Sequence, residues 1–543
     1  MEHINITGED FYNMIVNGSN SLERQKDFVN SLNVFPVPDG DTGTNMSMTF
    51  RSAVTEMDSF NGRNIGDIAK KVAKGALMGA RGNSGVILSQ IFRGISKGLE
   101  GKEKVDAAEF ANALLEGSKS AYKAVMRPTE GTILTIIRAA AESAIRFEGE
   151  DVASLMKEVC EYSENILNKT PEMLPVLKKA KVVDAGGMGL LIILKGMYEV
   201  LDKDLKVKLQ GEMSSSTTKT AVQQCNEEIK YGYCTEFFIL TDKIDVDSFR
   251  AELETLGDSM IVVADEDLVK VHIHTNDPGY ILSKAVKLGP LSKIKIDNMR
   301  EQHNHIIDME NNDKYKSENQ EEEETKRYGF ISVALGEGIN AIFKDLGVDE
   351  VIEGGQTMNP STEDIVKAID KINAENIFIF PNNKNIIMAA TQAVDIVDKN
   401  VVVIPTKTIP EGITAITMFN SEADVSENEK QMKEAMETVA TGSITYAVRD
   451  TEIDEKIIHE GDILGLVQGK IKEVGNDIFD VCSNIIKSMV NEDSELISVF
   501  YGKDCDSNKV EEFIDKLEEE YEDIDVQCYE GKQPLYYFIV SVE

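Results

Sequence analysis

The segment that decides the fold runs from Pro38 to Asn45, PDGDTGTN, and a helical pattern begins directly after it. The apolar residues that follow are spaced by four, four and three positions: Met46, Phe50, Val54 and Met57. This spacing places them on one face of an amphipathic helix. The helical period continues to about residue 203, so we predict an all-α domain over residues 1–203.

Three further segments of small, hydroxyl and glycine residues also open onto amphipathic helices. They are Gly79–Gly85 (GARGNSG), Pro128–Thr132 (PTEGT) and Asp184–Gly189 (DAGGMG). In an up-and-down bundle or barrel, helices taken two apart begin at the same rim, so we expect the four openings to converge. Convergent helix N-termini offer free backbone N–H groups and positive dipole ends, which predicts a polyphosphate site. The alternative is four glycine-containing turns that bind nothing.

The first opening also carries two carboxylates. Asp39 and Asp41 stand two residues apart across a glycine, where they can offer hard oxygen ligands to one or two Mg²⁺ ions. The hydroxyls of Thr42 and Thr44 can cap the helix or donate to phosphate. A plain turn is the alternative, because Asp and Gly favour turns without any ligand.

Motifs of other phosphate-binding enzymes are missing. There is no GxxxxGK[ST] loop and no protein-kinase set of lysine strand, HRD loop and DFG. The segment GNSGV at residues 82–86 has valine where a nucleophile elbow needs glycine, so we interpret Ser84 as a phosphate-facing hydroxyl.

Length and charge limit the classes of function. At roughly 100–200 residues per domain, 543 residues indicate about three domains. The net charge of −38 argues against a large nucleic-acid-binding face and against docking on anionic lipid. The longest apolar stretches fall far short of the ~20 residues of a membrane span.

The polar opening MEHINITGED lacks the apolar core of a signal peptide, so we expect a cytoplasmic protein. In that reducing compartment we expect the six cysteines to form no disulfides.

Composition shifts divide the chain further. The polar stretch Gly211–Thr220 indicates a linker over residues 204–227, and short strands mixed with helical segments predict a small α/β middle domain over 228–308. Residues 309–327 are charged and nearly free of apolar side chains, so we expect them to form a solvated acidic connector. Over 328–543 we predict an α/β domain with a mainly parallel sheet and a mixed second lobe from Thr441. Its first strands are Tyr328–Ala334, Ile377–Pro381 and Val401–Pro405, and its first helices are Ile339–Leu346, Thr362–Ile372 and Asn385–Val397.

The middle domain holds a candidate zinc site. His272 and His274 lie in a strand-like run, where alternation puts both on one face. With Cys234 on another strand they can form a three-ligand Zn²⁺ set, completed by Glu236 or by water. The alternative is two exposed strand histidines and a buried thiol.

The motif Leu32–Met46 (LNVFPVPDGDTGTNM), together with GARGNSG and VVDAGGMG, closely resembles the catalytic subunit of bacterial fatty acid kinase. The first domain is similar to the nucleotide-binding L subunit of dihydroxyacetone kinases. The resemblance covers essentially the whole chain in the same three-part order. It implies an eight-helix barrel that holds ATP and two Mg²⁺ ions at one rim, and a Zn²⁺ ion in the middle domain at Cys234, His272 and His274.

The resemblance also implies site residues in the first domain. Asp39 and Asp41 would be the catalytic metal ligands. Dihydroxyacetone kinases have an earlier third aspartate, whose nearest equivalent here is Asn33, a neutral and weaker ligand at slightly different spacing. The implied nucleotide contacts are Thr42, Gly43, Thr44, Asn45, Asn83, Ser84, Gly85, Thr132, Asp184, Ala185 and Gly186.

The implied phosphoryl acceptor is a fatty acid on a separate fatty-acid-binding carrier protein of the DegV-like (FakB) type, which gives an acyl phosphate for phospholipid synthesis. A carboxylic acid with a pKa of ~4–5 is ionised at neutral pH and attacks without a general base. The lack of an obvious catalytic histidine in residues 1–203, where His3 is the only histidine, is then no objection to this acceptor. The repulsion between the two anionic reactants would be screened by Mg²⁺ and by helix ends. Arg81 or Arg127 is a further candidate for this screening, and the alternative for each arginine is a plain surface role.

Three polar loops follow predicted strands of the C-terminal domain, at the strand ends where α/β folds bind ligands. They are Gly354–Thr362, Pro381–Asn385 and Pro405–Thr408. With the resemblance, we expect them to form the docking surface for the carrier; without it, they are ordinary polar loops. Self-association as a homodimer through the second and third domains stays open.

Three rival functions stay open as well. A kinase of a small ketose or polyol would turn over free substrate without a protein partner. A zinc hydrolase would lose activity on substitution of His272 but not of Asp41. A non-catalytic nucleotide-sensing scaffold would bind ATP without consuming it.

Overall fold

The computed structural model describes residues 3–33, 40–58, 64–125, 127–207, 233–241, 249, 252–253, 256–265, 268–298, 325–355, 359–453 and 456–543. At some strand positions, including Cys234, His272 and His274, it describes the backbone alone. The expected linker stretch Gly211–Thr220 and residues 309–324 of the expected connector lie outside the described residues. The chain divides into two compact units, Met1–Met213 with Thr325–Glu543, and Ser214–Glu324.

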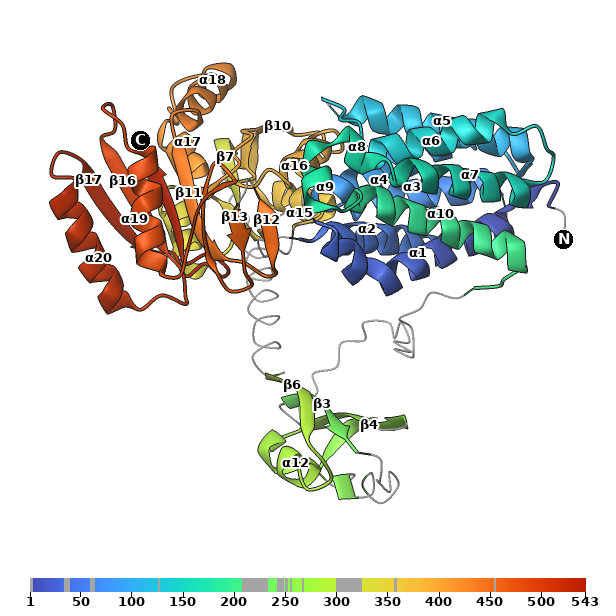
Figure 1. Cartoon of the computed structure of the whole chain (residues 1–543), viewed down its shortest axis with the longest axis horizontal. Helices are drawn as coiled ribbons and strands as arrows, with labels where there is room; N and C mark the ends of the chain where they lie inside the picture. The colour runs from blue at the N-terminus through green and yellow to red at the C-terminus, as the bar shows by residue number, and fades with distance from the viewer. Residues whose placement is uncertain are drawn as a thin grey trace. The chain divides into compact units, whose positions relative to one another are not determined.

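The helical part, residues 3–207, is a barrel in which each long helix packs against the next and α10 closes the ring on α1 (Figure 1). Its eight long helices are α1 (Gly8–Ser31), α2 (Thr42–Asp58), α3 (Ile65–Met78), α4 (Gly82–Gly98), α5 (Ala107–Ala124), α6 (Ile133–Arg146), α7 (Val152–Leu167) and α10 (Ala185–Lys203). Smaller elements are α8 (Thr170–Met173), α9 (Pro175–Ala180), β1 (Ile6–Thr7) and β2 (Lys104–Val105). The predicted all-α barrel is confirmed.

Apolar stripes at helical spacing fill the interior of the barrel. Phe50 of α2 and Phe92 of α4 are buried there with their rings stacked at 4.8 Å between centroids. Glycines allow close helix pairs: a Cβ on Gly94 of α4 would lie 2.2 Å from the carbonyl oxygen of Glu116 on α5. Side-chain caps begin several helices, as at Asp106, whose carboxylate accepts a hydrogen bond from the third residue of α5.

The middle unit contains a four-stranded antiparallel sheet in the order β4-β5-β3-β6. Its elements are β3 (Tyr233–Leu240), β4 (Gly257–Asp265), β5 (Leu268–Thr275), β6 (Leu291–Asn298) and the helix α12 (Pro278–Ala285). Phe237, Val271 and Ile273 are fully buried together with Ile281 of α12, so one face of this sheet packs on the helix. The predicted α/β character of this part is confirmed.

The C-terminal part, residues 325–543, begins with a parallel sheet in the order β10-β9-β7-β8. Its strands are β7 (Lys326–Ala334), β8 (Glu350–Glu353), β9 (Ala374–Phe380) and β10 (Asn400–Val403). Its helices are α14 (Glu337–Asp345), α15 (Thr362–Lys371), α16 (Ile387–Val394), α17 (Ile409–Thr417) and α18 (Val425–Met436). Helices cover both faces, since Ile377 and Ile379 share a core with α15 and α16, whereas Phe378 and Phe380 share one with α14, α17 and α18.

A second, six-stranded sheet follows in the order β15-β14-β11-β18-β16-β17. Its strands are β11 (Ala440–Tyr446), β14 (Ile463–Val467), β15 (Lys470–Gly475), β16 (Leu496–Tyr501), β17 (Asp525–Glu530) and β18 (Phe538–Val542). Other elements are the hairpin strands β12 (Thr451–Ile453) and β13 (Lys456–Ile458) and the helices α19 (Ile478–Met489) and α20 (Ser507–Glu520). Only β16 and β17 pair in parallel within it, so the predicted parallel arrangement holds for the first sheet and the predicted mixed lobe for the second.

The helical and C-terminal parts share a core within their common unit. Ala80 and Val86, at the start of α4, are buried in the same apolar cluster as α15 and α16. The backbone N–H of Thr362 donates to the carbonyl of Ala80 at 3.1 Å. The carboxyl ends of β9 and β10 therefore face the starts of the barrel helices.

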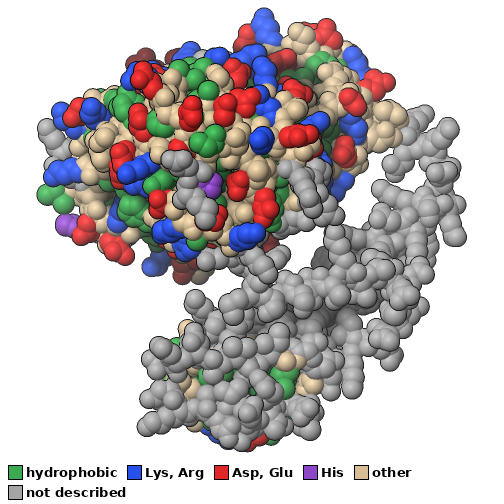
Figure 2. All heavy atoms as spheres, turned by 90° about the vertical axis from the view of Figure 1, so that its right-hand side faces the viewer, with side chains coloured by type: hydrophobic (Ala, Val, Ile, Leu, Met, Phe, Trp, Pro, Cys, Tyr) green, Lys and Arg blue, Asp and Glu red, His purple; other side chains and the backbone are tan. Residues whose placement is uncertain are grey.

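The described surface carries both signs of charge. On the face shown in Figure 2, basic and acidic side chains are interspersed over the described residues without a large patch of either sign. None of the helices in the described ranges is both long and apolar enough to cross a membrane.

Candidate functional site

A cavity of about 690 Å³ lies between the helical and C-terminal parts, and all four glycine-rich openings contribute to its wall. They begin α2, α4, α6 and α10, which are alternate long helices of the barrel. The lining residues of the helical part are Asn33, Gly40, Asp41, Thr42, Asn45, Asn83, Ser84, Ile87, Thr132, Ile133, Asp184 and Gly186. Four positive helix ends thus surround one space, which is the arrangement that binds anions.

The first opening contributes Asp41 and Thr42 to the cavity, while Asp39 lies outside the described residues. The Thr42 hydroxyl donates to Oδ1 of Asn33 at 2.7 Å, and Nδ2 of Asn33 donates to the carbonyl of Asn30 at 3.1 Å. Asn33 is therefore held between the end of α1 and the start of α2. In the described structure its side-chain oxygen fixes Thr42 at the cavity wall.

Asn30 positions the start of α2, although no motif in the sequence marks this residue. Its Oδ1 accepts hydrogen bonds from the backbone N–H groups of Gly43 at 2.8 Å and Thr44 at 3.1 Å, and its Nδ2 donates to the Thr44 hydroxyl at 2.9 Å. The N–H groups of Gly43 and Thr44 therefore already donate to a side chain of the protein, and neither Gly43 nor Thr44 lines the cavity. A Cβ on Gly43 would lie 2.2 Å from the carbonyl oxygen of Lys26, so the glycine permits α2 to pack on α1.

The second opening contributes Asn83 and Ser84. Asn45 of α2 lies beside them in the wall and is almost fully buried. Gly85 does not line the cavity: a Cβ there would lie 2.3 Å from Oγ1 of Thr49, so this glycine serves the packing of α4 against α2.

The two arginines considered for charge screening do not line the cavity. Arg81 is used at the contact with the C-terminal part, where its guanidinium donates to the carbonyl of Asn359 at 2.8 Å and lies 3.4 Å from a carboxylate oxygen of Asp364. Arg127 is exposed. The expectation that either one faces the phosphates is not met by the described geometry, because ion pairing at the domain contact satisfies Arg81 and Arg127 points to solvent.

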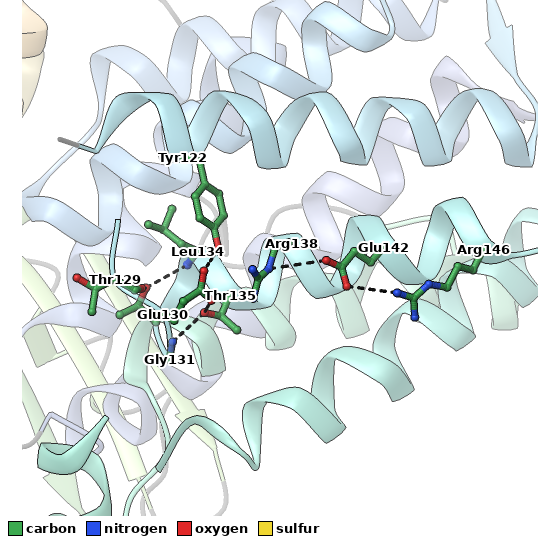
Figure 3. Close-up of polar contacts among 10 residues, drawn as sticks. Tyr122, Thr129, Glu130, Gly131, Leu134, Thr135, Arg138, Glu142 and Arg146 are labelled. Atoms are coloured by element: carbon green, nitrogen blue, oxygen red, sulfur yellow. Dashed lines mark hydrogen bonds and ion pairs between the residues drawn. The ribbon is translucent and has the colours of Figure 1, made fainter. Parts of the chain in front are cut away.

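The third opening is held by a network around Glu130 (Figure 3). The carboxylate accepts hydrogen bonds from Tyr122 of α5 at 2.9 Å, and from Thr135 at 2.6 Å and Arg138 at 2.7 Å on α6. Burial and this hydrogen bond raise the pKa of Tyr122 to about 12, so its hydroxyl stays a donor at physiological pH. The network joins the turn before Thr132 to two helices and so fixes the residue that caps α6 at the cavity wall.

The fourth opening begins with Asp184, which caps α10 and lines the cavity. Its carboxylate accepts hydrogen bonds from the backbone N–H of Gly187 at 2.7 Å and from that of Ile133, so it ties the start of α10 to the start of α6. Burial raises the pKa of Asp184 to about 6 against the effect of these bonds. Gly186 also lines the cavity, whereas Ala185 is buried beside it.

The opposite wall comes from the C-terminal part and was not predicted as part of this site. Its members are Asn382, Asn383, Lys384, Asn385, Lys407, Thr408, Ile409, Thr441, Ser443, Leu466, Gln468, Gly469, Lys470, Tyr536 and Ile539. The cationic side chains among them are Lys384 and Lys407, from the loops after β9 and β10, and Lys470, the first residue of β15. The loops Pro381–Asn385 and Pro405–Thr408, expected to dock a carrier, thus face the helix starts in the described structure.

Hydrogen bonds also join the helical and C-terminal parts beside the cavity. The Asn359 side-chain amide donates to a carboxylate oxygen of Asp41 at 2.5 Å, and that of Asn83 donates to Oδ1 of Asn385 at 3.3 Å. The Oδ1 atoms of Asn83 and Asn359 are buried acceptors without a hydrogen-bond partner among the described residues. A buried oxygen of this kind is expected to have a partner. The Asp41 carboxylate, which lines the cavity, is a hard oxygen donor of the type that Mg²⁺ prefers.

The described residues contain no cluster of three or more His, Cys, Asp or Glu side chains that could hold a metal ion. The side chains of Cys234, His272 and His274 lie outside the description, as does Asp39. The strand register makes Cys234 the direct partner of His274, and Glu236 that of His272, across β3 and β5. The backbone thus brings the predicted zinc ligands to neighbouring register positions.

Family models match the chain in three consecutive segments. A DAK2 domain covers residues 36–199, the middle domain of FakA-like fatty acid kinase proteins covers 230–306, and the C-terminal domain of the same proteins covers 329–543. The chain is 46% identical to protein YloV of Bacillus subtilis over 99% of both chains. It is 42% identical to a protein of Staphylococcus epidermidis and to one of Staphylococcus aureus, again over 99% of each chain.

Solved structures show more distant likenesses. A DegV family protein of Corynebacterium glutamicum is 9% identical with a TM-score of 0.31, covering 40% of this chain and 97% of that one. The fatty acid kinase B3 protein of Streptococcus pneumoniae, loaded with linoleic acid, is 10% identical with a TM-score of 0.26, covering 34% of this chain and 76% of that one.

Proposed function

Because the chain belongs to the family of FakA-like fatty acid kinase proteins, we propose that it is an ATP- and Mg²⁺-dependent kinase subunit that phosphorylates a fatty acid on a separate carrier protein. The product would be an acyl phosphate. The observation that carries the proposal is the convergence of four helix starts, with Asp41 among them, on a single cavity. This arrangement suits a polyphosphate with its metal ions.

The residues of the cavity fit such a ligand. Asp41 would hold Mg²⁺ together with Asp39, and Asn33 is a further candidate oxygen donor. The other proposed nucleotide contacts divide into those that line the cavity, which are Thr42, Asn45, Asn83, Ser84, Thr132, Asp184 and Gly186, and those that support the wall from behind, which are Gly43, Thr44, Gly85 and Ala185. When bound, Mg²⁺ would neutralise part of the phosphate charge and orient the transferred group.

The chemistry needs no general base. A fatty acid carboxylate with a pKa of about 4–5 is already ionised at neutral pH, so it can attack the phosphoryl group directly. The main barrier is then the repulsion between two anionic reactants.

Lysines of the C-terminal part would reduce this repulsion between the anionic reactants. Lys384, Lys407 and Lys470 face the helix starts across the cavity, where their charges would lower the repulsion between the triphosphate and the carboxylate. These cations belong to the C-terminal part, for which the sequence predicts a docking role.

A phosphoryl-transfer assay tests the proposal. The purified chain is incubated with ATP, Mg²⁺ and a labelled fatty acid, with and without candidate DegV-like carriers. We expect a labelled acyl phosphate that forms only with a carrier. Asp41→Ala should lower the rate at least about 100-fold, because charge stabilisation at the phosphoryl group is lost.

Asp27→Ala is the matched control for this assay. Asp27 is exposed on α1 and does not line the cavity, so its removal should leave the rate unchanged. Turnover of free dihydroxyacetone without a carrier would instead indicate a ketose kinase. Binding of ATP without consumption, over a full set of carriers, would indicate a nucleotide sensor.

We also propose that the middle part binds Zn²⁺ through Cys234, His272 and His274. The supporting observation is the pairing of β3 with β5, which makes Cys234 and His274 direct neighbours. Metal analysis of the purified chain should find one equivalent of zinc, and Cys234→Ala should lower it several-fold because three ligands are needed for tight binding. An unchanged zinc content in that variant would contradict the assignment.

A further inference from the structure

Asn359 is a residue of the C-terminal part that reaches the proposed metal site of the helical part. It is 1% exposed, and its Nδ2 donates to Oδ2 of Asp41 at 2.5 Å. Its Oδ1 is buried without a hydrogen-bond partner among the described residues. One side-chain amide therefore contacts the carboxylate and also presents an unsatisfied acceptor beside it.

The main chain around Asn359 is fixed independently of this contact. Its carbonyl accepts a hydrogen bond from the Arg81 guanidinium at 2.8 Å, and that guanidinium also pairs with Asp364 in the first turn of α15. Three residues further along, the N–H of Thr362 donates to the carbonyl of Ala80. These contacts hold the main chain of residues 359–364 against the helical part without the side chain of Asn359.

We infer that Asn359 is a positioning residue for the metal-binding carboxylate of Asp41, so that the C-terminal part completes the magnesium–nucleotide site of the helical part. The inference rests on the proposed function. Groups that hydrogen-bond to metal ligands orient them and tune their affinity. With Oδ2 of Asp41 held by Asn359, the carboxylate is fixed in one orientation relative to the cavity.

The residue type suits this role. An amide donates to a carboxylate without adding positive charge, whereas a lysine or arginine at this place would compete with the cation for Asp41. The unpaired Oδ1 can accept a hydrogen bond from water, and Mg²⁺ characteristically keeps several waters when it binds to proteins. Asn83, a residue of the cavity wall, also has a buried Oδ1 without a hydrogen-bond partner among the described residues.

Metal–nucleotide binding by the full chain tests this inference without any turnover. Mn²⁺ replaces Mg²⁺ as a paramagnetic probe, a non-hydrolysable ATP analogue is added, and free Mn²⁺ is followed by electron paramagnetic resonance. We expect Asn359→Ala to weaken Mn²⁺ binding about 10-fold, the lower range for loss of a group that orients a metal ligand. Asn359→Ser, whose hydroxyl is too short to reach Asp41, should show the same loss.

Gln392→Ala is the matched control. Gln392 of α16 is buried at the same contact between the two parts and donates to the hydroxyl of Ser89 at 3.3 Å, but it does not line the cavity. If Asn359 acted only by holding the parts together, Gln392→Ala would weaken Mn²⁺ binding to a similar degree. Our inference predicts that it does not.

The outcomes separate this inference from the proposed function. Wild-type Mn²⁺ affinity in both Asn359 variants, together with its loss in Asp41→Ala, would overturn the role of Asn359 and leave the kinase proposal standing. No nucleotide-dependent Mn²⁺ binding by the wild-type chain would overturn the proposed function itself. Equal losses in the Asn359 and Gln392 variants would reduce Asn359 to a packing residue. Thermal melting of each variant identifies one that fails to fold.

Discussion

The two walls of the cavity carry different chemical groups. The helical wall offers backbone helix starts, hydroxyls and the carboxylates of Asp41 and Asp184, whereas the C-terminal wall offers Lys384, Lys407 and Lys470 at the ends of strands. The first wall suits a metal ion and phosphates, and the second suits a negative charge that approaches them. Because the proposed reaction joins two anions, each wall supplies what the other lacks.

Removal of the three lysines should have the largest effect on this division of roles. In the triple variant Lys384→Ala, Lys407→Ala and Lys470→Ala, we expect the rate of acyl phosphate formation to fall about 100-fold or more, because charge stabilisation across the cavity is lost. Nucleotide binding should weaken far less, since the helical wall is intact. Steady-state rates and calorimetric titration of the ATP analogue measure the two effects.

A second triple variant controls for net charge. Lys430→Ala, Lys487→Ala and Lys516→Ala remove three exposed lysines of α18, α19 and α20 that do not line the cavity. Both variants change the net charge by the same amount, so any long-range effect of charge is shared. Equal rates in the two triple variants would contradict a specific role for the cavity lysines.

The helical wall was predictable because its signals are local. Glycine-rich openings followed by apolar residues at helical spacing locate the starts of α2, α4, α6 and α10, and the alternation of helices along a barrel brings these starts to one rim. Thr132 and Asp184 could be found in this way because each stands directly before a helix, where such residues cap.

The C-terminal wall could not be predicted because its place depends on tertiary packing. The sequence located helix α15 to within one residue of its observed end, Lys371, and placed the loops after β9 and β10 at ligand-binding strand ends. The sequence does not show that Ala80 and Val86 pack into the core of α15 and α16. This packing places the loops after β9 and β10 opposite the helix starts. The strand β8 was missed because it has only four residues, none of them fully buried.

Substitution of Asn30 tests how much its hydrogen bonds to the start of α2 stabilise the helical wall. Asn30→Ala leaves the N–H groups of Gly43 and Thr44 without their acceptor, so we expect the free energy of unfolding to fall by about 1–2 kcal/mol, as for loss of a helix cap. Chemical denaturation measures it. Asn112→Ala, which removes an exposed asparagine within α5, should change stability much less. Equal changes would show that Asn30 does not position α2.

The buried carboxylate of Asp184 predicts a distinctive pH dependence. Its pKa is about 6 in the folded chain and about 4 when unfolded, so the folded state binds more protons between these values. The free energy of unfolding should therefore fall as pH rises from about 4 to about 6, with a slope of at most about 1.4 kcal/mol per pH unit from this group. Asp184→Asn keeps a capping oxygen but should lose this component.

Asp151, which caps α7 away from the cavity, should contribute to the pH dependence of the unfolding free energy with the opposite sign. Burial raises the pKa of Asp151, but hydrogen bonds from Ser154 and His3 outweigh it, so the pKa lies below its ordinary value. Its contribution to stability is present above about pH 4 and is lost as the pH falls through the lowered pKa. Denaturation curves of Asp184→Asn and Asp151→Asn should thus diverge from the wild type in opposite directions. Parallel curves would contradict the raised pKa of Asp184.

Tyr122→Phe should have the smallest effect on nucleotide affinity, because Tyr122 does not line the cavity and contacts the wall only through Glu130. The lost hydroxyl donates to Glu130 at 2.9 Å, and the Thr135 and Arg138 bonds to that carboxylate remain. At about 0.5–1.5 kcal/mol for one hydrogen bond, nucleotide affinity should fall about two- to ten-fold if the turn before Thr132 loosens. In Tyr198→Phe a similar bond, from Tyr198 to Asp202 at 3.1 Å, is lost away from the cavity, so affinity should not change. If both variants bind the ATP analogue like the wild type, the Glu130 network stabilises the barrel without positioning its helix start.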